Sequence, residues 1–109
     1  RRVANYVALP FYQNMLSLSG YAEDVEKVTR ALSRGGKENF WGPPGLDEGA
    51  KAVSDRMMDA LALSGDTKEW PKKVDKYREA GVSLPCPFFN PVGPDPATAV
   101  LEGISAFSG

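Results

Sequence analysis

The sequence contains no histidine and only one cysteine, Cys86. Without histidine the chain lacks the commonest general base and the commonest metal ligand in proteins. A single cysteine cannot form an internal disulfide, and the two shortages together exclude a Cys/His zinc site. The sequence therefore predicts no metal site, and its low cysteine content favours a reducing, cytoplasmic setting.

Excess charge and long hydrophobic runs are also absent. The net charge of −1 gives no general attraction to nucleic acid or anionic lipid. No apolar run approaches the ~18 residues that a membrane span requires. We therefore expect neither a nucleic-acid partner nor a membrane. The first residues already have a helical pattern with no capping residue before them, so we expect the sequence to begin inside a longer protein.

The apolar residues present predict five helices. Helical spacing and capping residues place these helices at about 1–19, 22–34, 48–64, 66–80 and 96–107. In the first helix Val3, Val7, Phe11 and Met15 recur every four residues, and Pro10 should kink the run. The pair Met57–Met58 is expected in the core, and Asp55 and Asp59 on a solvated face.

A loop is predicted at residues 35–46, which hold four glycines and two prolines. We expect at least one of its two large aromatics, Phe40 and Trp41, to pack against a neighbour.

One strand is predicted after the fourth helix. Val82, Leu84, Cys86 and Phe88 alternate with other residues at period two, and Cys86 is interpreted as a small buried apolar residue. Pro85 and Pro87 lack N–H donors on the same edge, so that edge should be weakly paired. Since one strand cannot make a sheet, its partners must come from the rest of a parent protein or from a second chain, including a homo-oligomer.

Several short motifs, in this order, resemble the end of the luciferase-like monooxygenases and their F420-dependent relatives. The matching positions are Asp59–Leu63, Gly65, Tyr77–Val82, Leu84–Pro85 and Asn90–Pro91, together with an opening that carries Tyr6, Leu9, Pro10, Tyr12 and Asn14. The order and spacing of these motifs carry the resemblance, which extends over nearly the whole chain. The 35–46 loop and Trp70–Pro71 depart from the family's pattern.

The resemblance implies a (β/α)₈ TIM barrel of about 250 residues in the parent protein. Residues 1–109 would then be the C-terminal portion of one barrel domain and supply its eighth strand. The implied function is part of a flavin- or F420-dependent oxidoreductase, which transfers hydride or activates oxygen with FMN or F420 at the mouth of the barrel. The alternative is a small helical protein-interaction module without catalysis. Such a module should bury Val82, Leu84 and Phe88 under its own helices, whereas a portion of a barrel should leave them in need of neighbouring strands.

The candidate site residues are Phe88, Phe89 and Asn90, at the C-terminal end of the predicted strand. The two rings could line a flat isoalloxazine-like ring or an apolar substrate, or they could fill the barrel core. No catalytic residue is identified. The predicted helix starts at Asp47, Asp66 and Asp95 carry carboxylates that would repel a phosphate. We therefore expect neither FMN nor F420 to bind tightly to this chain alone.

Overall fold

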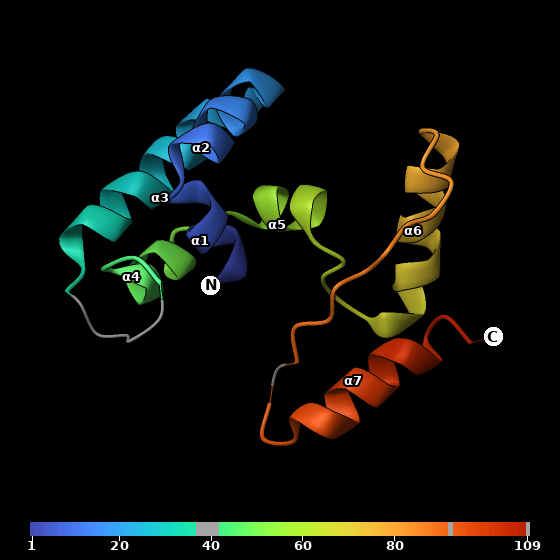
Figure 1. The fold of residues 1–109 in the computed structure, drawn as a ribbon. Coiled ribbons are helices and arrows are strands. Elements are labelled where there is room, and N and C mark those ends of the chain that lie inside the picture. Colours follow the sequence, from blue (N-terminus) through green and yellow to red (C-terminus); the bar gives the residue numbers. More distant parts are fainter. Residues whose placement is uncertain (37–41, 92, 109) are drawn as a thin grey trace. The chain divides into compact units, whose positions relative to one another are not determined.

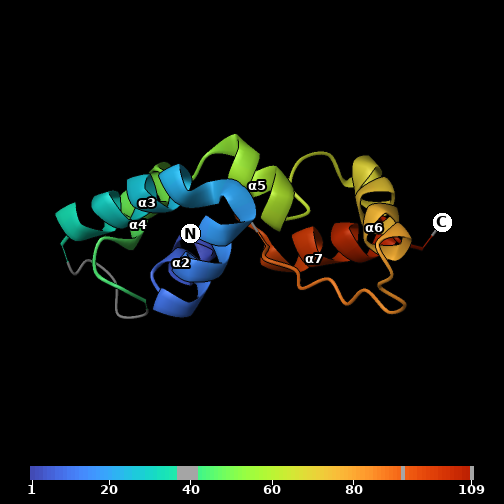
Figure 2. The ribbon, with the colours of Figure 1, turned by 90° about the horizontal axis from the view of Figure 1, so that it is seen from above.

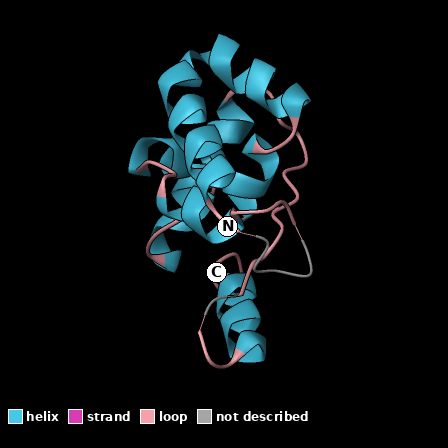
Figure 3. Ribbon diagram, turned by 90° about the vertical axis from the view of Figure 1, so that its left-hand side faces the viewer, coloured by secondary structure: helices cyan, strands magenta, loops and turns pink. Residues whose placement is uncertain are grey.

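The computed structural model describes residues 1–36, 42–91 and 93–108 of the chain. Figure 3 shows helices and loops in this part, and no strand. The prediction of a mainly helical chain is therefore confirmed. The chain divides into two compact units, Arg1–Ala62 and Leu63–Gly109 (Figure 1).

The first predicted helix is in fact two helices, α1 (Arg2–Val7) and α2 (Pro10–Leu16). Leu9 between them is extended, with φ −95° and ψ 126°. A residue before proline disfavours the helical region, whereas proline itself fits the first position of a helix. Pro10 therefore starts a new helix instead of kinking an existing one. The helical backbone continues as η1 (Ser17–Tyr21), in which Gly20, at φ 91°, makes a second kink.

The break at Leu9 changes which side chains of the first unit are buried. Val3 and Val7 are buried as predicted, but Phe11 is 73% exposed and Met15 is 43% exposed. In α2 the buried residue is Leu16. The predicted inward face is therefore wrong beyond Val7, because the four-residue spacing is not carried through an extended residue.

The remaining helices of this unit are α3 (Ala22–Arg34), α4 (Leu46–Lys51) and α5 (Asp55–Leu61). A single helix over 48–64 was expected, but it is interrupted at Ser54, which is extended and whose hydroxyl accepts a hydrogen bond from the Met57 amide at 3.2 Å. In Figures 1 and 2, α4 lies beside α3, and it also contacts α1. The core of the unit is formed by Val3, Ala4, Val7, Leu16, Val25, Val28, Leu32, Leu46 and Met57.

The predicted glycine-rich loop is closed at its ends by two glycines. The Gly45 amide donates to the Gly36 carbonyl at 2.9 Å. A Cβ atom on Gly35 would lie 2.3 Å from the Gly45 Cα, and one on Gly45 would lie 2.1 Å from the Leu32 carbonyl oxygen. Only glycines permit this approach of backbone to backbone. Phe40 and Trp41 lie outside the described residues, so their predicted packing is not tested.

The second unit contains η2 (Thr67–Glu69), α6 (Trp70–Glu79) and α7 (Pro96–Ser105). Pro71 lies in the first turn of α6, where its missing N–H costs no helical hydrogen bond, so α6 begins at Trp70. Residues 82–91 form neither helix nor strand. The predicted strand is therefore wrong for this structure, because a strand requires a paired neighbour and Pro85 and Pro87 lack donors for one.

Candidate functional site

The candidate residues Phe88, Phe89 and Asn90 lie on the segment that joins α6 to α7. The segment begins with a sharp reversal, in which Gly81 has φ 101° and the Val82 amide donates to the Tyr77 carbonyl at 2.9 Å. This is the glycine-terminated C-cap that commonly ends a helix. At the other end, Asp95 caps α7. Both ends of the segment are thus fixed by local hydrogen bonds, and the candidate residues lie between them.

Phe89 packs against the two helices of its own unit. Its ring centroid lies 6.3 Å from that of Trp70, and the Trp70 and Phe107 rings are stacked at the same centroid distance. Gly103 of α7 is buried and leaves the space that Phe89 occupies, since a Cβ there would lie 2.6 Å from the Phe89 ring. Phe89 therefore serves packing in this unit.

A shallow apolar cavity of about 330 Å³ adjoins Phe89. Residues of α6 and α7 and alternate residues of the joining segment line it, among them Val74, Pro85, Pro87, Phe89, Ile104 and Phe107. The only charged side chain at this cavity among the described residues is Arg78, whose guanidinium donates to Asp75 at 2.7 Å.

The intervening residues of the segment do not line this cavity. Leu84 is 78% exposed and Phe88 is 76% exposed, and Cys86 and Asn90 are also exposed. The interpretation of Cys86 as a buried residue is therefore wrong for this structure. The three candidates are adjacent in the chain but do not form one surface, because Phe89 faces the helices while Phe88 faces solvent.

The helix starts at Asp47, Asp66 and Asp95 do not suit a phosphate. Hydrogen bonds from the Thr98 hydroxyl and amide hold the pKa of Asp95 below its usual value, so the start of α7 is negative at neutral pH. Asp66 caps η2 in the same way, accepting from the Lys68 amide at 2.9 Å. The expectation for Asp47 is wrong in detail, because Gly45 is the N-cap of α4 and Asp47 lies in the first turn, 3.1 Å from Arg1. None of these three helix starts therefore offers a favourable site for an anion.

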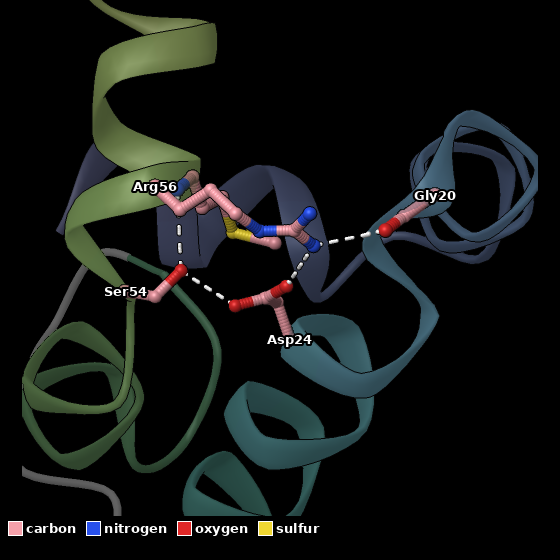
Figure 4. Close-up of polar contacts among 5 residues, drawn as sticks. Gly20, Asp24, Ser54 and Arg56 are labelled. Atoms are coloured by element: carbon pink, nitrogen blue, oxygen red, sulfur yellow. Dashed lines mark hydrogen bonds and ion pairs between the residues drawn. The ribbon is translucent and has the colours of Figure 1, made fainter.

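A second cluster of polar residues, which the sequence did not reveal, joins α3 to α5 (Figure 4). Asp24 is buried and accepts hydrogen bonds from Ser54 at 2.5 Å and from Arg56 at 2.7 Å. The Arg56 guanidinium also donates to the Gly20 carbonyl at 2.9 Å and lies 4.4 Å from the centre of the Tyr21 ring. These contacts, the Ser54 hydrogen bond first, lower the pKa of Asp24. Every polar group of Asp24 thus has a structural partner, and the cluster holds helices together.

Other residues considered from the sequence have ordinary surroundings. Met57 is fully buried and Met58 half-buried in the first unit, as predicted. Asp55 and Asp59 are both exposed, as expected for a solvated face. Within the described ranges no group of histidine, cysteine, aspartate or glutamate side chains could hold a metal ion, and no helix is long and apolar enough to cross a membrane.

Comparison with known proteins finds no matching family model, no matching curated protein and no matching solved structure.

Proposed function

We propose that this chain is a portion of a flavin- or F420-dependent oxidoreductase of the luciferase-like family. The ordered motifs from Tyr6 to Pro91 suggest the family. The observation that carries the proposal is the exposure of Leu84 and Phe88, at 78% and 76%. A self-contained interaction module would bury these side chains under its own helices, whereas a barrel strand requires neighbouring strands, of which the described residues contain none. The exposed apolar side chains of the segment support the barrel.

The chain alone offers little binding energy for either cofactor. A stacked aromatic ring contributes about 1 kcal/mol, whereas micromolar affinity requires about 8 kcal/mol. Because the helix starts at Asp47, Asp66 and Asp95 carry carboxylates, the phosphates of FMN or F420 would have to be bound by other parts of the parent protein. Hydride transfer or oxygen activation is chemistry that the bound cofactor would supply, and the residues of this chain would wall and orient its ring.

The test is a titration of two proteins, the full-length parent and the 109-residue chain, with FMN and with F420, followed by cofactor fluorescence. We expect the parent to bind one of the two cofactors at micromolar or lower concentration and the chain to bind neither. If the parent binds neither cofactor, the proposed function is wrong. Micromolar binding by the short chain would instead show that the cofactor site lies within residues 1–109.

A further inference from the structure

Two faces of the α6–α7 segment differ in what they contact. In an extended backbone, successive side chains point to opposite sides. Pro85, Pro87 and Phe89 line the cavity against α6 and α7. Leu84, Cys86 and Phe88 alternate with them, do not line the cavity and are exposed; Pro87 lines the cavity but is also exposed. The segment thus has a side that lines the cavity and an outward side, although residues 82–91 form no strand.

We propose that the outward side, Leu84–Cys86–Phe88, faces the interior of the parent barrel and that Phe88 contacts the bound cofactor or substrate. This inference rests on the proposed function. In a (β/α)₈ barrel the helices cover the outer face of each strand, so side chains opposite to the helices point inward. Ligands bind at the C-terminal ends of the strands, and Phe88 is the apolar outward residue nearest that end. Phe89, beside Trp70, belongs to the layer between strand and helices and does not touch the ligand.

The composition of the outward side indicates the class of ligand group it contacts. Leu84, Cys86 and Phe88 carry no charge, and Asn90, which follows at the same alternation, offers an uncharged amide. Such a wall suits a flat or aliphatic group without charge, such as an isoalloxazine-type ring or an apolar substrate. A charged part of the ligand would lose its hydration there without gaining a partner.

Cys86 allows the orientation to be tested without any measurement of activity. Iodoacetamide labelling of Cys86 is followed by mass spectrometry of its peptide, in the 109-residue chain, the folded parent and the unfolded parent. We expect labelling in the folded parent to be slower than in the other two by more than about tenfold, because burial restricts access to the thiol. Equal rates in the folded parent and the short chain would overturn the inward orientation, whichever cofactor the parent binds.

Two neighbouring substitutions in the parent separate ligand contact from packing. Phe88→Ala should weaken binding of the bound cofactor, FMN or F420, or of an apolar substrate, by about 3- to 10-fold, the loss expected for one ring contact, and Phe88→Tyr should restore most of it. Phe89→Ala should lower the melting temperature and leave these affinities unchanged. If Phe89→Ala weakens binding and Phe88→Ala does not, the assignment of the two rings is wrong, although cofactor binding by the parent would still support the proposed function.

Discussion

Asp24 is the residue whose environment departs furthest from that of an ordinary surface carboxylate. It is 7% exposed and accepts hydrogen bonds from Ser54, the N-cap of α5, and from Arg56, which lies within α5. A buried carboxylate without partners would be costly, so the three groups stabilise the contact between α3 and α5 only as a set. Loss of Ser54 or Arg56 removes one partner of the buried Asp24 carboxylate, whereas the Arg56 side chain, at 61% exposure, remains in contact with solvent.

Asp24→Asn should therefore lower the stability of the first unit at neutral pH, and the effect should depend on pH. The pKa of Asp24 is lowered, so its charged form stabilises the fold above the unfolded pKa of about 3.9. This contribution is lost as pH falls through the folded pKa. In urea unfolding, the difference in midpoint between Asp24→Asn and the unmodified chain should stay constant from pH 7 to pH 5 and shrink below about pH 4.

Glu26→Gln is the matched control for this substitution. Glu26 lies on the same helix but is exposed and pairs with Arg30. Exposed pairs contribute about 0–1 kcal/mol, so its midpoint should change little. A difference for Asp24→Asn that persists undiminished at pH 2 would show that the amide disturbs packing and that charge is not the cause.

Among the elements, α6 and α7 approach each other where Gly103 faces Phe89 and Trp70. Gly103, in the last turn of α7, leaves room for the Phe89 ring, which in turn lies beside Trp70. Alanine is ordinarily the better helix former by about 0.5–1 kcal/mol. Here the added methyl group would overlap the ring, so steric overlap and helix propensity act in opposite directions.

Gly103→Ala should destabilise the second unit by about 1–3 kcal/mol, the usual cost of overpacking. Displacement of Phe89 should also change the near-ultraviolet circular dichroism of Trp70. The control is Gly36→Ala, because a Cβ at Gly36 meets nothing within 4 Å. If Gly103→Ala instead raises the stability, as a glycine-to-alanine change in a helix ordinarily does, then the packing of the Phe89 ring does not require glycine at position 103.

The sequence predicted the helices better than their interruptions. The helices predicted at 22–34 and 66–80 correspond to α3 and α6. The sequence located an interruption at Pro10 but predicted a kink and not a break, and the break at Ser54 was missed because it lies inside a run whose spacing looks continuous. Ser54 does carry a signal, since serine is a common N-cap. Its contact with Asp24, 30 residues away in the chain, has no local signature.

The candidate site was predictable in position but not in orientation. Alternation of apolar residues located the segment around Phe88, yet the sequence grouped Phe88 and Phe89 as one wall. Their separation depends on Gly103 and Trp70, which come from two other elements. Strand pairing was predicted incorrectly because period two indicates only which side chains share a face, while pairing depends on a neighbour.

Over the whole molecule, burial is distributed unequally between the two units. Nine buried apolar residues form the core of the first unit. Among the described residues of the second unit, Val74 is the only buried apolar side chain. Local stability follows the apolar area that each part removes from water, so the units should open independently.

Hydrogen exchange of the 109-residue chain should therefore show slower exchange in α3 than in α6 and α7. The expected order follows from the buried side of α3, where Val25, Val28 and Leu32 pack in the core. Fragments resolved by mass spectrometry at neutral pH would give the comparison. Equal protection of α3 and α7 would mean that the chain unfolds as one cooperative body, contrary to this expectation.

The glycine closure at Gly35 and Gly45 has a consequence for how the protein can vary in evolution. Its two ends are joined by backbone contacts that any side chain would prevent, so selection at these positions acts on the absence of a side chain. Substitutions at either position should be purged whatever their polarity. Related sequences should therefore keep a glycine at both positions, even where the surrounding sequence differs.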